Sequence, residues 1–175
     1  YLIYWSVETY GIWLAIQAIV NFLSMLDFGH QTFLGYEFLR FGRENRQELS
    51  KYLWSGVVIG VIISLFQIIL IVILLVSGAL PILLGESNTL DVNMMDSAGI
   101  VLVLQSITYL FVVSISGLFT RVLSPFGYYP RVAWWGVVYA IVTAIAPLIA
   151  VVFGADLLVA GIVASGAMLA ISIPL

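Results

Sequence analysis

The sequence predicts an all-α, polytopic transmembrane helical bundle. Hydrophobic residues make up 63% of the 175 residues and charged residues only 9%. Soluble domains average about 45–50% apolar and about 25% charged residues, so this chain lacks the polar side chains that cover a water-exposed surface. The charges also gather in short patches, and the uncharged stretches between them are long enough to cross about 30 Å of hydrocarbon as helices.

We expect five membrane-spanning helices, because one crossing needs roughly 20 apolar residues and strands of a barrel would be shorter and alternating. The expected helices cover residues 10–38, 52–76, 97–120, 134–153 and 157–175. The first is long because its second half contains Asp27, His30 and Glu37, so we expect that half to emerge at the membrane face or to line protein. Ser77-Gly78 and Pro81 supply a stop for the second helix.

The distribution of basic residues indicates how the helices are oriented. All six Lys and Arg lie in two connections, Arg40–Lys51 and Arg121–Arg131, while the alternate connections contain only acidic charges. The positive-inside rule assigns both basic connections to the cytoplasm. Tyr and Trp residues occur near both ends of the expected spans, as in the aromatic belts of membrane proteins.

The chain reads as one transmembrane domain over residues 1–175. Because the first helix starts at the face opposite the basic connections, an earlier helix is needed to deliver Tyr1 there, and the last helix reaches Leu175 without a polar flank. We therefore expect a piece of a larger polytopic protein, with further helices before Tyr1 and after Leu175.

Composition excludes several function classes. A net charge of −3 and a pI near 4.8 argue against a nucleic-acid partner. The absence of cysteine and the single histidine leave no thiolate or histidine metal cluster. Asp27-Phe28-Gly29 matches a kinase magnesium motif by letters only, without the loops that accompany it, and nothing positions a Ser/His/Asp set. We expect no metal, no cofactor and no enzymatic activity.

The polar residues of the first helix are the main candidates for a functional site. At 100° per residue, Gln17, Asn21, Ser24, Gln31 and Gly35 share one stripe with Asp27 at its edge, while His30 and Glu37 lie on another face. A carboxylate at mid-bilayer costs roughly 2.5–3.5 kcal/mol, so such groups usually face protein or a wet cavity. Two interpretations stay open. The stripe is either the wall of a substrate path with Asp27 or His30 able to titrate, or an interhelical hydrogen-bonded seam with Asp27 near the cytoplasmic interface.

Two further helices have informative residues. Gly56, Gly60, Ser64 and Gln67 form one small-residue face on the second helix, which favours close helix packing. Dimerisation and a sliding gate are the alternatives. Pro147 is expected to kink the fourth helix.

Residues 8–51 resemble a known family of membrane proteins. Glu8-Thr9-Tyr10-Gly11-Ile12-Trp13, followed after an apolar run by Leu26-Asp27-Phe28-Gly29, is similar to the second transmembrane helix of bacterial polysaccharide (O-antigen and capsule) flippases. These flippases belong to the multidrug/oligosaccharidyl-lipid/polysaccharide exporter superfamily, which includes the MATE transporters. Arg40-Phe41-Gly42 and the polar turn before Lys51 resemble the first cytoplasmic connection of that family.

The resemblance implies a fold, a location and an activity. The chain would form five helices of the N-terminal lobe in a two-lobed MATE-like fold of the bacterial inner membrane. Such proteins flip lipid-linked oligosaccharide or polysaccharide repeat units between leaflets by alternating access. The expected partners are a polyprenyl diphosphate-linked glycan and membrane lipids, with the glycan and the coupling ion unspecified.

This function requires a polar cleft with cations near the diphosphate. No Lys or Arg lies deep within an expected span, so the cations come from the edges of the spans or from a missing lobe. The residues predicted to line the substrate path are Gln17, Asn21, Ser24, Asp27, His30, Gln31, Arg40, Arg121 and Arg131.

Three other functions remain open. A drug/cation antiporter of the same superfamily would have a strongly acidic membrane pocket, which these spans lack. An intramembrane glycan polymerase or transferase would need a long extracytoplasmic loop, whereas the connection around residues 86–96 is short. A scaffold bundle would keep the stripe of the first helix dry, against other helices.

Overall fold

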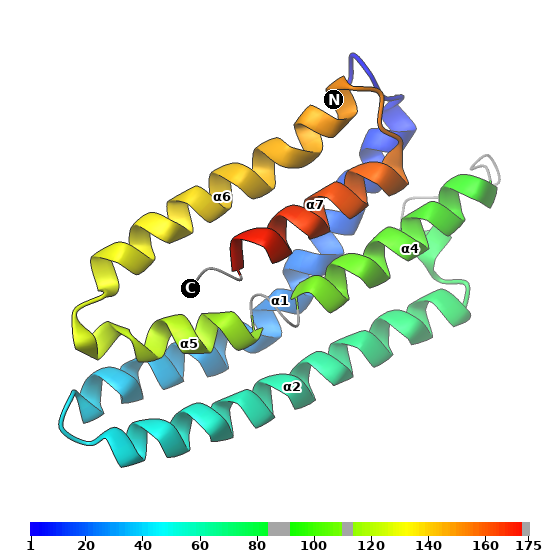
Figure 1. The fold of residues 1–175 in the computed structure, drawn as a ribbon. Helices are drawn as coiled ribbons and strands as arrows, with labels where there is room; N and C mark the ends of the chain where they lie inside the picture. The colour runs from blue at the N-terminus through cyan, green and yellow to red at the C-terminus, as the bar shows by residue number, and fades with distance from the viewer. Residues whose placement is uncertain (84–91, 110–113, 173–175) are drawn as a thin grey trace.

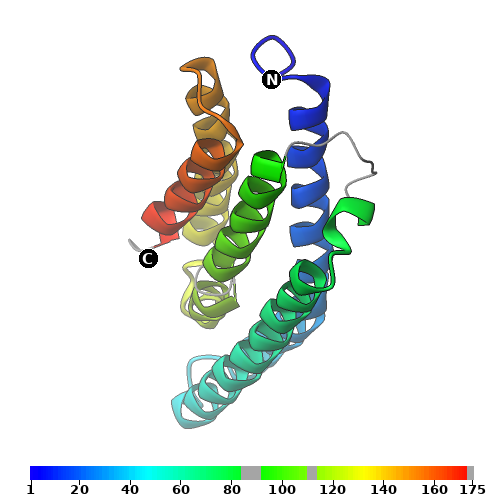
Figure 2. The same ribbon diagram turned by 90° about the vertical axis from the view of Figure 1, so that its right-hand side faces the viewer.

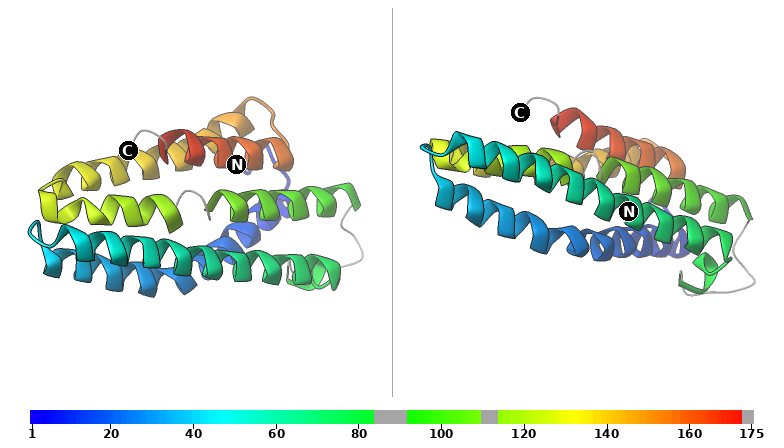
Figure 3. Two further views of the ribbon diagram at one scale, coloured as in Figure 1. Left: turned by 60° about the horizontal axis from the view of Figure 1, so that its bottom comes forward. Right: turned by 90° about the horizontal axis from the view of Figure 1, so that it is seen from below.

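The computed structural model describes residues 1–83, 92–109 and 114–172, and within these ranges the chain is helical without a strand. The elements are α1 (Val7–Phe41), α2 (Arg46–Val76), α3 (Leu80–Leu83), α4 (Val92–Tyr109), α5 (Gly117–Val122), the 3₁₀ turn η2 (Ser124–Phe126), α6 (Tyr129–Val152) and α7 (Leu157–Ser172). The long helices lie roughly lengthwise beside one another (Figure 1). In Figures 2 and 3, α4 and α5 lie between the α1–α2 pair and the α6–α7 pair.

Four segments are long and apolar enough to cross a membrane, which confirms the all-helical prediction. They are α1, α2, the 93–126 segment that contains α4 and α5, and α6. The predicted fifth span differs, because α7 has 16 residues and would reach only about 24 Å. Residues 173–175 lie outside the described part of the chain, so a fifth crossing stays a prediction.

Four of the described helices, α1, α2, α4 and α6, begin before the residues at which the uncharged stretches start. α2 begins at Arg46 instead of 52, and the Asn45 side chain caps it by accepting from the Glu48 N–H at 3.5 Å. α6 begins at Tyr129 instead of 134, with Pro130 in its first turn. The start of a helix is set by where its first backbone N–H groups are capped and not by where the apolar residues begin. The first turns of these helices are therefore polar and precede the apolar segment. The predicted stop after residue 76 is confirmed, and Gly78 adopts a φ of 68° that suits glycine.

The predicted helix 97–120 lies within the apolar segment 93–126, of which α4, residues 114–116 and α5 are described. α4 ends at Tyr109, residues 114–116 wind as a π-helical turn, and α5 begins at Gly117. Residues 110–113, which the prediction included, lie outside the described ranges. A π-helical turn rotates the side chains that follow it relative to an α-helix. The turn brings Ser114 against α2, where its Oγ is 2.7 Å from the position that a Cβ on Gly60 would occupy.

The small-residue face of α2 packs inside the chain. Its predicted members, Gly56, Gly60, Ser64 and Gln67, are all buried. A Cβ on Gly56 would clash with a methyl group of Leu34, so only glycine allows α1 and α2 to approach this closely. The prediction of close helix packing is therefore confirmed for this face.

Two apolar clusters lie at different levels of the bundle. One, toward the end that contains the N-terminus, includes Ile16 of α1 and Val101 of α4. The other, toward the α1–α2 connection, is built from Leu34, Phe38, Leu49 and Leu118. Between them, at residues 24–31 of α1 and 56–67 of α2, the buried residues are mostly small or polar. The bundle thus has a polar layer between two apolar layers.

Substitution of Gly60 by Leu tests this close packing. A side chain there would overlap Ser114, and overpacking of this kind costs about 1–3 kcal/mol. We expect Gly60→Leu to lower the melting temperature of the detergent-solubilised protein by several degrees. Gly166→Leu is the matched control, since a Cβ there meets nothing within 4 Å. Equal melting temperatures for both variants would contradict the described helix packing.

Candidate functional site

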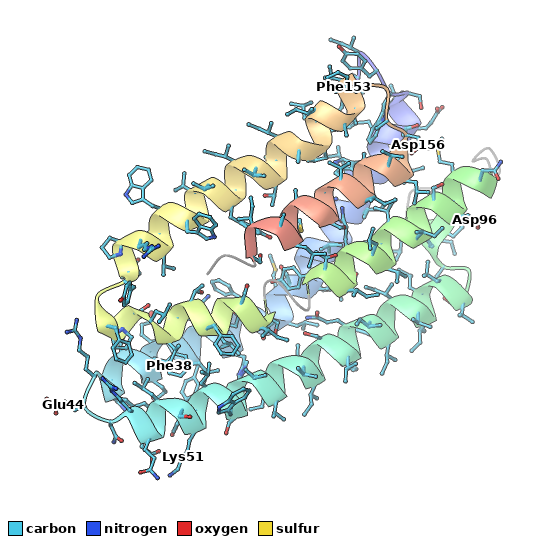
Figure 4. The ribbon with its side chains drawn as sticks, viewed as in Figure 1. Phe38, Glu44, Lys51, Asp96, Phe153 and Asp156 are labelled. Carbon is cyan, nitrogen blue, oxygen red and sulfur yellow. The ribbon has the colours of Figure 1, made fainter. Side chains whose placement is uncertain are left out.

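The basic connections lie together at one end of the bundle. Arg43 Nε in the α1–α2 connection donates to the carbonyl oxygen of Pro125 in η2 at 2.9 Å, which joins the two basic connections. Figure 4 places Glu44 and Lys51 at this end and Asp96 and Asp156 at the opposite end. At that opposite end, Trp5 Nε1 donates to the Ala155 carbonyl at 2.8 Å. The bundle therefore has a basic end and an acidic end, as the predicted orientation requires.

The first half of the polar stripe on α1 does not form one continuous wall. Gln17 Nε2 donates to Gln105 Oε1 of α4 at 3.0 Å, so Gln17 joins two helices. Asn21 is exposed, and its carbonyl accepts from Ser24 Oγ at 2.6 Å. The Tyr109 phenol lies beside Ser24. Gln17 and Ser24 thus contact α4, whereas Asn21 points away from the bundle.

Asp27 and Gln31 form the buried centre of the stripe. Asp27 is 1% exposed, and one of its carboxylate oxygens accepts from Gln31 Nε2. Its other oxygen, Oδ1, has no hydrogen-bond partner within the described residues. Gln31 also packs against α5, because its Oε1 lies 2.7 Å from where a Cβ on Gly117 would be. The carboxylate therefore lines protein.

His30 lies on the face of α1 that packs against α2. Its Nε2 is 3.1 Å from the Gly56 carbonyl oxygen. A carbonyl only accepts, so this nitrogen donates and holds the proton. His30 thus connects two helices, on a face different from that of Gln31. Gln67 makes a similar connection by donating to the Leu23 carbonyl at 2.8 Å.

A cavity of about 520 Å³ lies beside the α5–α6 connection, toward the basic end of the bundle. Residues of α1, α5, η2, α6 and α7 form its walls. The lining includes one guanidinium, four aromatic rings and several hydroxyl or amide groups, from Arg121, Tyr36, Tyr129, Trp135, Tyr139, Gln31, Thr32, Ser116, Thr120, Ser124 and Ser172. The lining is mostly apolar, with Arg121 as the charged group among the described residues that form it.

Arg121 holds its guanidinium against α1. Its Nη1 lies 3.6 Å from where a Cβ on Gly35 would be, so the guanidinium is within van der Waals distance of α1 at that residue. Arg121 takes part in neither of the two ion pairs found among the described residues, which are Glu37–Arg40 and Glu48–Lys51. Its charge is therefore available to an anion in the cavity.

The predicted path residues divide between several places. Gln31 and Arg121 line the cavity, and Asp27 is connected to it through Gln31. Gln17, Ser24 and His30 lie between helices. Asn21, Arg40 and Arg131 are exposed. The aromatic lining was not anticipated, because Tyr129 and Trp135 read in the sequence as members of an interfacial belt; their clustering between residues 128 and 139 was the available signal.

Comparison with models of protein families, with curated proteins and with solved structures gave no match.

Single cysteines test whether the cavity is wet, since the chain contains none of its own. We expect Thr32→Cys, in the cavity wall, to react with a membrane-impermeant methanethiosulfonate. Ile62→Cys, on the exposed apolar face of α2, is the control and should stay unreactive because a lipid-facing thiol does not ionise readily. Mass spectrometry of the labelled protein gives the measurement. Unreactive cysteines at both positions would mean that the cavity is dry.

Proposed function

We propose that this chain is part of a transporter that flips lipid-linked oligosaccharide or polysaccharide repeat units across the bacterial cytoplasmic membrane by alternating access. The observation that supports it most is the cavity at the basic end, where Arg121 lies among aromatic rings and hydroxyls. The guanidinium would bind a phosphate oxygen of the diphosphate, since arginine binds phosphate through paired N–H donors. The rings of Tyr129 and Trp135 would stack on sugar faces, and the hydroxyls would replace water around the glycan.

The resemblance of residues 8–51 to the polysaccharide flippases also supports this proposal, because that stretch contains the polar residues of α1. In a flippase the glycan and diphosphate must avoid hydrocarbon while the polyprenyl tail stays in lipid, which a cavity between helices allows. The chain would be a lobe that needs helices outside residues 1–175 to complete the path. Under this proposal the chain has no enzymatic activity and no cofactor.

A drug/cation antiporter of the same superfamily is the second candidate. Asp27 favours it, because a buried carboxylate with one unpartnered oxygen is a group to which a cation could bind. The cavity argues against it, since the charged group in the cavity wall is a cation, Arg121. The two functions are separable by the charge of the molecule that is transported.

Transport assays on Arg121 variants test the proposal. In vesicles that contain the full-length protein, Arg121→Ala should raise the concentration of lipid-linked oligosaccharide that gives half-maximal transport by roughly 10- to 100-fold. The reason is that a hydrogen bond to a charged group is worth about 1.5–3 kcal/mol. Arg121→Lys should recover part of the loss. Arg46→Ala, at an exposed position at the start of α2, should behave as wild type. Unchanged transport in Arg121→Ala, or transport of organic cations in place of the glycan lipid, would contradict the flippase assignment.

The orientation is tested by reporters fused beside Arg46 and beside Asp156. The two positions lie at opposite ends of the bundle, and the positive-inside rule assigns the basic end to the cytoplasm. We expect a cytoplasm-dependent reporter to be active beside Arg46, and an alkaline phosphatase fusion, which is active only outside the cytoplasm, to be active beside Asp156. Activity of one reporter type at both positions would exclude the transmembrane arrangement itself.

A further inference from the structure

A second cavity lies at the acidic end of the bundle, where α1, α4 and α7 begin and α6 ends. Its volume is about 410 Å³, within the range of about 300–1,000 Å³ that is typical of small-molecule sites. Figure 4 shows Asp156, one of its lining residues, at the end of the bundle opposite Lys51. The lining side chains with a hydroxyl, amide or carboxylate group are Tyr4, Ser6, Thr9, Asn93, Ser97 and Asp156.

The connection between α6 and α7 forms one wall of this acidic-end cavity. Gly154 ends α6 with a φ of 86°, a left-handed conformation that suits glycine. The Ala155 carbonyl that follows accepts from Trp5 Nε1 at 2.8 Å. Asp156 Oδ1 then caps α7 by accepting from the Val159 N–H at 2.8 Å. Hydrogen bonds to the segment before α1 and to α7 therefore hold this wall in place.

Two polar groups of the cavity wall are placed to accept hydrogen bonds. Ser97 Oγ donates its hydrogen to the Asn93 carbonyl of its own helix at 2.9 Å, so toward a ligand this oxygen acts as an acceptor. A carboxylate has about four acceptor positions, and the bond from Val159 uses one of those of Asp156. Asp156 takes part in neither of the two ion pairs among the described residues. A ligand that fits these groups is therefore rich in hydrogen-bond donors.

The charge of this end disfavours an anionic ligand. Asp156 is the charged side chain among the described residues of the cavity wall. Glu8 lies in the first turn of α1, and Asp96 lies at the same end of the bundle in Figure 4. All six Lys and Arg residues belong to the two connections at the opposite end. A phosphate group here would meet negative charge without a basic partner, so an uncharged ligand fits better.

Two aromatic rings lie beside these acceptors. Trp5 is buried, and it is fixed by its bond to Ala155 and by an edge-on contact with Trp13 at 6.0 Å between ring centroids. Tyr4, also in the wall, is exposed. A sugar ring has C–H groups on its faces and O–H groups around its edge. Aromatic rings next to hydrogen-bond acceptors match that pattern, since the face of an aromatic ring is electron-rich.

We propose that the acidic-end cavity binds an uncharged sugar residue. Hydroxyls of the sugar donate to Ser97 Oγ and to the Asp156 carboxylate, and one face of the sugar packs on Tyr4. The role of this site in transport rests on the proposed function. The cavity with Arg121 takes the diphosphate at the basic end, and the acidic-end cavity holds a sugar of the repeat unit at the other end, without any contact that would retain the phosphate. Sugar binding itself does not depend on that role.

Saturation-transfer NMR with free sugars tests the site. The full-length protein in lipid nanodiscs, without lipid-linked glycan, is titrated with a panel of neutral methyl glycosides of hexoses, deoxyhexoses and N-acetylhexosamines. We expect at least one glycoside to bind, and we expect neither glucose phosphate nor benzyltrimethylammonium to displace it. Binding of none of the glycosides would overturn the proposal. Displacement by benzyltrimethylammonium or by glucose phosphate at a similar concentration would also overturn it, because the site would then select for charge.

Variants of Ser97 locate the bound sugar. Ser97→Ala removes one acceptor and should raise the Kd of the bound glycoside about 2- to 10-fold. Ser106→Ala is the matched control, because Ser106 lies on the same helix outside the cavity wall and its Oγ donates to the Leu102 carbonyl in the same way. An equal Kd in both variants would place the sugar elsewhere and overturn the proposal.

Asp156 and Tyr4 variants test the other two contacts. Asp156→Asn keeps the helix cap but removes the charge, so the Kd of the glycoside should rise about 5-fold. Tyr4→Ala should raise the Kd about 2- to 10-fold, and Tyr4→Phe should restore it because packing uses the ring face. A wild-type Kd in both Asp156→Asn and Tyr4→Ala would contradict the site. These titrations need no transport, so a failed transport assay leaves them unchanged, and absent sugar binding leaves the Arg121 test of the flippase assignment intact.

Discussion

The structure depends on one constraint, which is that polar groups within a bilayer must find their partners inside the protein. The interhelical hydrogen bonds of this bundle show how that constraint is met. Gln17 binds Gln105, His30 binds the Gly56 carbonyl, and Gln67 binds the Leu23 carbonyl, so each contact joins two helices. Apolar side chains drive little association in lipid, because the tails around them are equally apolar. These bonds and the close approach at Gly56 and Gly60 therefore set the register of α1, α2 and α4.

Asp27 is one of the buried groups that this arrangement leaves incompletely satisfied, together with Gln105 Nε2 and Ser114 Oγ. Asp27 lies one hydrogen bond from the cavity wall, through Gln31. The interhelical hydrogen bonds of α1 and the cavity are therefore adjacent in this fold. Gln31 belongs to both, because it bonds Asp27 on one side and faces the cavity on the other.

The cavity wall contains a basic side chain, whereas the polar layer contains an acidic one. Arg121 provides a positive charge near the basic end, where an anionic ligand would arrive from the inner leaflet under the proposed orientation. Asp27 lies two turns deeper. The charges are separated by helix packing around Gly35 and Gly117, where Arg121 and Gln31 lie.

The sequence by itself determined the membrane class, the end of α2, the common end of the basic connections and the packing face of α2, because hydropathy, charge and small-residue spacing act locally along one helix. It could not reveal that Asn21 is exposed while Gln31 is buried, or that Tyr129 and Trp135 line a cavity together with residues of α1. A periodicity predicts which residues share a face, but not which neighbour that face meets. Only the tertiary structure decided that Gly60 meets Ser114 and that Gln31 packs at Gly117, since both depend on the register between helices, which is fixed by contacts between residues far apart in the chain.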